Sequence, residues 1–159
     1  MEEKQQKPLY FPVFVNIQDK KILVIGGGTV ALRKTRTLTR FCSRITVVAP
    51  EIQQGFDTLK VSGYRRIFRE EDLDGIDLAI IATNDELLNT EIAGLCEKRG
   101  ILKNVASDRK LCDFYFPSVI EHDGTVIGIG SGGDPAKSRA LREWLEAMMQ
   151  TEKSDRITK

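Results

Sequence analysis

The sequence has few of the residues from which metal centres and disulfide frameworks are built. It contains one histidine, His122, and three cysteines, Cys42, Cys96 and Cys112, with no CxxC spacing. An odd number of scattered cysteines predicts free thiols in a reducing compartment, and hence a cytoplasmic protein. With a single histidine and no local cluster of ligands, the sequence predicts no metal site.

Long hydrophobic runs and a net charge of either sign are also missing. No apolar run approaches the roughly 20 residues of a membrane span, and residues 1–7 are polar with no apolar block after them, unlike a secretory signal. The formal net charge of +1 creates no strong field toward nucleic acid or membranes. No basic stripe is interleaved with stacking aromatics, so neither nucleic acid nor membrane is a predicted partner.

Short apolar segments alternate with helical patterns over the first two thirds of the 159-residue chain. Strands are predicted at 13–17, 21–25, 45–49, 64–68, 78–82 and 101–105, and helices at 30–41 and from Asn84 or Asp85 to Gly100. The central apolar runs are too continuous for half-exposed strands, which favours strands that are covered on both faces. The sequence therefore predicts an α/β fold with a Rossmann-like, mostly parallel sheet and helices on both faces.

The pattern changes in the last third of the chain. Residues 114–120 and 125–130 flank the turn His122-Asp123-Gly124 and predict a β-hairpin. A last helix is predicted after Pro135, and residues from 151 onward are polar. We expect a Rossmann-like domain at 8–112, a hairpin and helix at 113–150, and flexible tails at 1–7 and 151–159.

A glycine-rich turn separates a predicted strand from the first predicted helix. It reads Gly26-Gly27-Gly28-Thr29-Val30-Ala31. This order brings backbone N–H groups and the positive end of a helix dipole to one point, where a phosphate binds. The spacing Gly26-x-Gly28-x-x-Ala31 fits the dinucleotide fingerprint: Gly26 makes the turn, Gly28 admits the pyrophosphate and Ala31 packs closely. A plain glycine-rich turn is the alternative.

Two further strand ends are candidate cofactor contacts. The ribose of a dinucleotide is expected near Pro50-Glu51, about 20 residues after the glycines, where a carboxylate disfavours a 2′-phosphate and predicts NAD over NADP. Glu51 as the cap of a following helical turn is the alternative. Thr83-Asn84 follows a buried strand and is expected near the nicotinamide ribose, or Asn84 simply caps the next helix.

Seven short segments occur in an order and spacing typical of one enzyme family. They are 10–14, 26–34, 47–51, 82–84, 104–105, 112–117 and 131–142. On these motifs the chain resembles the precorrin-2 dehydrogenases, the family that includes the N-terminal module of siroheme synthase. The similarity runs from about residue 9 to about 147 and matches the short, dehydrogenase-only members.

The resemblance implies NAD-dependent oxidation of precorrin-2 to sirohydrochlorin in siroheme biosynthesis, with NAD as the cofactor. It implies cofactor contacts from Thr29, Val30, Pro50 and Glu51. The fingerprint spacing adds Gly26, Gly27 and Gly28 to the candidate cofactor residues, and the end of the strand at 78–82 adds Thr83 and Asn84. It also implies a homodimer held by the C-terminal segment, substrate contacts from Ser131, Gly132 and Gly133, and iron insertion by a separate chelatase. Because such a substrate carries many carboxylates, the cationic Arg139 beside them is a further candidate contact; an ordinary solvated helix start is the alternative.

The acid/base of the reaction is less well defined, because the family's aspartate position holds Ser107 here. Asp108 follows directly and is our candidate catalytic residue; Asp113, or no essential carboxylate, are the alternatives. A bifunctional dehydrogenase and ferrochelatase is a rival function, which Ser107 argues against. A non-catalytic NAD-sensing module is a second rival.

Overall fold

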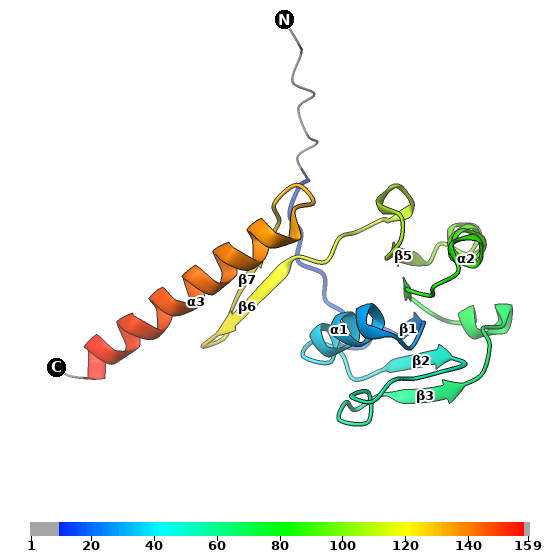
Figure 1. Cartoon of the computed structure of the whole chain (residues 1–159), viewed down its shortest axis with the longest axis horizontal. Helices are drawn as coiled ribbons and strands as arrows, with labels where there is room; N and C mark the ends of the chain where they lie inside the picture. The colour runs from blue at the N-terminus through cyan, green and yellow to red at the C-terminus, as the bar shows by residue number, and fades with distance from the viewer. Residues whose placement is uncertain (1–9, 158–159) are drawn as a thin grey trace, which may run out of the picture. The chain divides into compact units, whose positions relative to one another are not determined.

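The computed structural model describes residues 10–157 and divides the chain into two compact units (Figure 1). One unit is formed by residues 15–115. The other combines the chain before residue 15 with the chain from residue 116 onward. The tail expected at 1–7 lies outside the described residues.

The unit of residues 15–115 is built on a five-stranded parallel sheet. Its strands are β1 (Ile22–Ile25), β2 (Ile45–Ala49), β3 (Ser62–Arg65), β4 (Leu78–Ile81) and β5 (Leu102–Val105). They lie in the order β3-β2-β1-β4-β5, and every neighbouring pair is parallel. This confirms the predicted Rossmann-like sheet, because strands joined through helices pair in parallel.

Two helices cover the sheet from opposite faces. Leu23 and Ile25 of β1 belong to one buried cluster with Ile92 and Cys96 of α2 (Glu86–Lys98). Successive strand residues point to opposite faces, so Ile22 and Val24 face the other side. There α1 (Thr29–Leu38) packs against β1 and β4 through its four buried residues, Ala31, Leu32, Thr35 and Leu38. Two 3-10 turns complete this unit, η1 (Glu70–Leu73) and η2 (Arg109–Leu111).

The second unit contains the predicted hairpin and the last helix. Strands β6 (Ser118–His122) and β7 (Thr125–Ile129) pair antiparallel, and α3 (Pro135–Ile157) packs on both. Asp123 and Gly124 both have positive φ, 51° and 75°, as a two-residue turn of this kind requires. None of the described helices is both long and apolar enough to cross a membrane.

The elements differ from the sequence prediction mainly where a segment finds no partner. Residues 13–17, predicted as a strand, are irregular, and the side chains of Val13 and Phe14 are 67% and 81% exposed. Residues 114–117 are also outside β6. The last helix continues to Ile157, whereas a flexible tail was expected from 151.

Candidate functional site

The carboxyl edge of the parallel sheet brings four loops of the larger unit to one side. After β1 the chain turns to β2, and after β4 it turns the opposite way to β5, which creates a switch point between β1 and β4. Ligands of open α/β sheets bind outside such a point. The candidate cofactor residues follow the ends of β1, β2 and β4, and Asp108 follows the end of β5.

The turn after β1 is held tightly by its neighbours. Gly26 has a φ of +122°, and its N–H donates to Val48 O at 2.9 Å. A Cβ at Gly26 would overlap the carbonyl oxygen of Ala82, and one at Gly27 would overlap that of Glu51. Both glycines are therefore required by close backbone packing, the second for a reason that the fingerprint spacing alone does not reveal.

Gly28 differs from the two glycines before it. Its φ of −87° suits any residue, and a Cβ there would have no atom within 4 Å. The space that Gly28 leaves open is at the start of α1, where the fingerprint places a pyrophosphate. The hydroxyl of Thr29 donates to Gln53 Oε1 at 3.2 Å, which ties the first helical residue to the loop after β2.

The start of α1 carries no capping side chain and no acidic residue in its first turn. The other two α-helices that the structure describes are capped. Asp85 accepts from Leu88 N at 3.0 Å on α2, and Asp134 accepts from Lys137 N at 3.0 Å on α3. Because carboxylates occupy those two N-termini, α1 is the helix whose first N–H groups are open to an anion.

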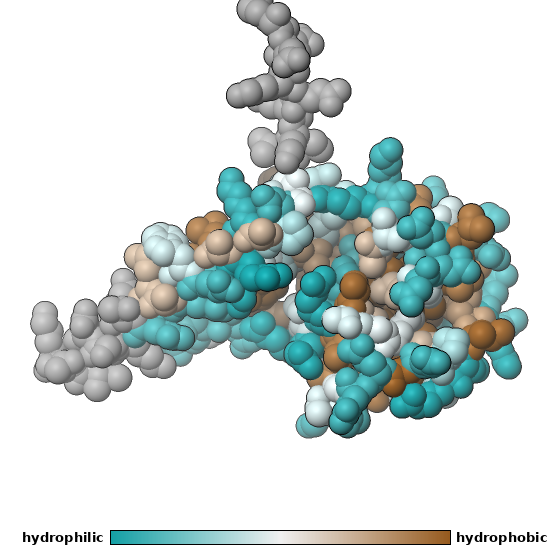
Figure 2. All heavy atoms as spheres, viewed as in Figure 1, coloured by the Kyte–Doolittle hydropathy of each residue, from teal (hydrophilic) through white to brown (hydrophobic). Residues whose placement is uncertain are grey.

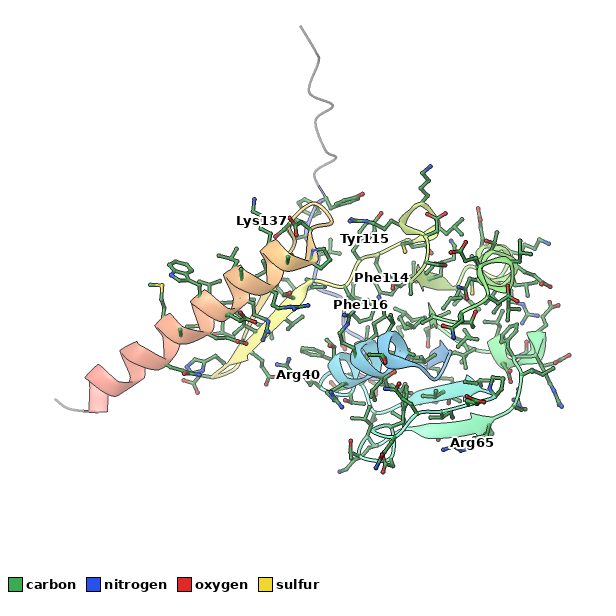
Figure 3. The ribbon with its side chains drawn as sticks, in the orientation of Figure 1. Arg40, Arg65, Phe114, Tyr115, Phe116 and Lys137 are labelled. Atoms are coloured by element: carbon green, nitrogen blue, oxygen red, sulfur yellow. The ribbon has the colours of Figure 1, made fainter. Side chains whose placement is uncertain are left out.

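The end of β2 offers one charge of each sign. Glu51 is exposed, and no helix follows it before β3, so it caps no helix. Arg65, at the end of β3, pairs in register with Ala49 and donates Nη1 to Ile52 O at 3.1 Å (Figure 3). No arginine follows β2 directly in the sequence, and Arg65 could not be assigned to this site from the sequence alone, because the neighbour of β2 is known only once the sheet order is known.

A buried network joins the ends of β4 and β5. Asn89 of α2 is 1% exposed, and its Oδ1 accepts from Thr83 N at 3.3 Å and from Thr83 Oγ1 at 2.6 Å. Its Nδ2 donates to Thr83 O and to Ser107 Oγ, both at 3.1 Å. Sequence reasoning missed Asn89, which the pattern shows only as one polar residue on an otherwise apolar helix face.

The two candidate aspartates have structural partners. Asp108 caps η2, accepting from Lys110 N at 2.8 Å, and is exposed. Asp113 accepts from Lys103 N at 2.9 Å and from Lys103 Nζ at 3.0 Å, which ties the chain after η2 to β5. Asn84 caps no helix, since Asp85 holds the N-cap of α2.

A second polar cluster lies between α1 and β5. Lys34 donates from Nζ to Asn104 Oδ1 at 2.6 Å, and Asn104, 3% exposed, donates to Phe114 O at 2.8 Å. Burial lowers the pKa of Lys34 to about 8. Burial also raises the pKa of the nearby Cys112 thiol, which accepts a hydrogen bond from Val105 N.

The expected substrate contacts Ser131, Gly132, Gly133 and Arg139 belong to the hairpin and helix unit. Gly132 and Gly133 have φ of 58° and 94°, and the turn closes with Asp134 N donating to Ser131 O at 3.1 Å. Their positive φ values explain both glycines. Arg139 is exposed on the first turns of α3. In the described part of the chain, no three histidine, cysteine or acidic side chains are arranged to hold a metal ion.

Comparison with known proteins gives a consistent result. Residues 13–118 match the family described as "Putative NAD(P)-binding". Siroheme synthase of Photorhabdus laumondii is 40% identical over 145 residues, 88% of this chain and 31% of that protein. Siroheme synthase 2 of Yersinia pestis is 38% identical over 151 residues, 92% of this chain and 32% of that protein.

A solved structure, SirC, precorrin-2 dehydrogenase, superposes with a TM-score of 0.72 at 25% identity, covering 87% of this chain and 70% of that one. The chain spans about a third of the length of the siroheme synthases that it matches.

Proposed function

Because the chain belongs to this NAD(P)-binding family and is homologous to the dehydrogenase module of siroheme synthase, we propose that it oxidises precorrin-2 to sirohydrochlorin with NAD⁺. The activity belongs to siroheme biosynthesis, and the substrate is a tetrapyrrole. The proposal assigns to this chain the dehydrogenase role for which its relatives are named.

One observation of the site carries the cofactor half of the proposal. The first N–H groups of α1 have no capping side chain, and Gly28 leaves the space before them open. A pyrophosphate fits both features, because it needs backbone donors, a favourable helix dipole and no Cβ in its path. Gly26, Gly27, Gly28, Thr29 and Val30 would hold it.

The rest of the dinucleotide would follow the carboxyl edge of the sheet in both directions. Pro50 and Glu51 would meet the adenosine ribose, where the Glu51 carboxylate accepts from hydroxyl groups and repels a 2′-phosphate, so NAD⁺ is preferred. Thr83 and Asn84, on the far side of the switch point, would meet the nicotinamide ribose. Bound there, the cofactor supplies the hydride acceptor.

The reaction removes two hydrogens from precorrin-2. One leaves as a hydride to NAD⁺, giving NADH, and the other leaves as a proton. We propose Asp108 as the proton acceptor, since its exposed carboxylate lies beyond β5 and has an oxygen to spare after capping η2. The protein's main contribution is to position the reacting carbon.

The substrate carries several carboxylates, which need cationic or N–H partners. In the smaller unit, Arg139 and the turn formed by Ser131, Gly132 and Gly133 supply such groups at the start of α3. We propose them as contacts for the carboxylates of precorrin-2.

The test is anaerobic. Purified protein is first titrated with NAD⁺ and NADP⁺, and we expect tighter binding of NAD⁺. Precorrin-2 is then added, and the sirohydrochlorin spectrum is followed with and without NAD⁺. Formation only with NAD⁺ supports the proposal. Binding without turnover would favour the NAD-sensing alternative, and siroheme after addition of ferrous iron would add chelatase activity.

A further inference from the structure

Asn89 is held so firmly by the backbone of Thr83 that its amide has one possible orientation. Its Oδ1 faces the N–H of Thr83, a donor only, and its Nδ2 faces the carbonyl of Thr83, an acceptor only. Rotating the amide by 180° would set donor against donor and acceptor against acceptor. In a side chain that is 1% exposed, such a mismatch carries the full cost of unsatisfied polar groups.

The fixed amide in turn determines what Ser107 can do. Nδ2 of Asn89 donates to Ser107 Oγ at 3.1 Å, so the serine oxygen is the acceptor in this bond. A hydroxyl that accepts from a fixed donor keeps its own proton for another partner. Ser107 itself is exposed and follows the end of β5, so this proton is available to a ligand at the carboxyl edge of the sheet.

We propose that Asn89 is a positioning residue, which orients the hydroxyl of Ser107 to donate a hydrogen bond to the nicotinamide half of the bound dinucleotide. The inference rests on the proposed function. The network lies at the ends of β4 and β5, and the pyrophosphate position lies at the end of β1, with β2 on its other side. If β2 meets the adenosine, the half that reaches β4 and β5 is the nicotinamide, whose carboxamide oxygen is an acceptor.

Comparing two ligands isolates this contact. ADP-ribose shares the pyrophosphate and both riboses with NAD⁺ but has no nicotinamide. Loss of one such bond weakens binding about threefold to tenfold, so Ser107→Ala should raise the Kd for NAD⁺ by that factor. The same variant should bind ADP-ribose like the wild type. Ser107→Thr keeps a hydroxyl and should restore NAD⁺ affinity, while Ser62→Ala, an exposed serine on β3, is the matched control.

Asn89→Asp tests the positioning role. The carboxylate introduced by this substitution cannot donate a hydrogen bond. The Ser107 hydroxyl must then donate its proton to that carboxylate and not to the ligand. NAD⁺ affinity should fall about as much as in Ser107→Ala. The double variant should lose no more NAD⁺ affinity than either single variant, because both changes remove the same contact. Should this variant fail to fold, Asn89→Ala takes its place, and its NAD⁺ affinity is measured with serine and with alanine at position 107.

Failure of the proposed Ser107 contact and failure of the proposed function give different results. If the wild type binds neither NAD⁺ nor ADP-ribose, the proposed function fails. If it binds both and Ser107→Ala loses neither, or loses both equally, the proposed contact is wrong while the function stands. If Asn89 variants weaken NAD⁺ equally with serine or alanine at 107, Asn89 is structural and does not act through Ser107.

Discussion

Gly27 and Gly28 are adjacent residues of the turn after β1, but a methyl group meets different surroundings at each. A Cβ at Gly27 would overlap the Glu51 carbonyl, whereas one at Gly28 would enter open space. We expect Gly27→Ala to lower the free energy of unfolding by more than about 1 kcal/mol, since backbone must move. Gly28→Ala should fold like the wild type and lose NAD⁺ affinity. Urea unfolding and NAD⁺ titration of both variants check this, and equal unfolding of the two would contradict it.

Lys34 makes stability depend on pH in a direction that follows from burial. The pKa of Lys34 is lowered from 10.5 to about 8, so between these values the unfolded chain binds the proton and the folded protein does not. The free energy of unfolding should therefore rise with pH across this window. Lys34→Gln keeps an N–H donor for Asn104 and should remove the rise.

The measurement is the difference between wild type and Lys34→Gln in urea unfolding at about pH 7.5 and about pH 9.5. Subtraction cancels the groups common to both proteins that do not interact with Lys34. A difference that does not change with pH would show that Lys34 is not buried as described.

Asp108 is the residue whose predicted role is tested most simply by substitution. Asp108→Asn keeps a capping oxygen for Lys110 N but cannot accept a proton as a base. We expect kcat to fall roughly a hundredfold, within the range of general-base catalysis, with the Kd for NAD⁺ unchanged. Asp113→Asn is the comparison, and full turnover by Asp108→Asn would leave no essential carboxylate at this position.

At the scale of elements, an ion pair between Lys103, which is buried, and Asp113, which is partly exposed, joins β5 to the chain after η2. Lys103 is 7% exposed and binds Asp113 through both its N–H and Nζ. Asp113→Ala leaves the buried Lys103 charge without this partner and should lower the free energy of unfolding by about 1–3 kcal/mol. The loss is smaller than for a fully buried pair, because the carboxylate is partly exposed. Combining it with Lys103→Met should recover most of the loss in urea unfolding. A double variant as unstable as Asp113→Ala would contradict this.

Elements were predictable from the sequence where their own pattern decides them. The run 45–49 is apolar apart from the β-branched Thr46 and forms β2 with those bounds, and Asp85 caps α2 as one of two residues expected to do so. Residues 13–17 have strand composition but stay irregular, because a strand also needs a neighbour, which composition does not reveal.

The site was predictable to the extent that it is local in sequence. The glycine turn and its position at a helix start follow from adjacent residues, so spacing finds them. Arg65 beside the end of β2, and Asn89 between Thr83 and Ser107, depend on which strands and helices meet. Those contacts join residues that are far apart in the chain, and only the sheet order brings them together.

At the scale of the whole molecule, α3 carries an apolar stripe that its own unit does not cover. Leu141, Trp144 and Met148, spaced on one helix face, are 40%, 57% and 50% exposed, and Figure 2 shows pale and brown side chains along α3. We expect the protein to be a homodimer through this face, as the family resemblance implies. Trp144→Glu should give monomers in sedimentation equilibrium, while Glu143→Gln should stay dimeric. A monomeric wild type would contradict this expectation.

We propose that this chain couples oxidation of precorrin-2 to reduction of NAD⁺. The most direct measurement is the anaerobic stoichiometry of NADH and sirohydrochlorin formed in one cuvette, with Gly28→Ala alongside. We expect equal amounts of NADH and sirohydrochlorin from the wild type, and slower formation of both by Gly28→Ala at limiting NAD⁺. Sirohydrochlorin formed without NADH, or no sirohydrochlorin despite bound NAD⁺, would contradict it.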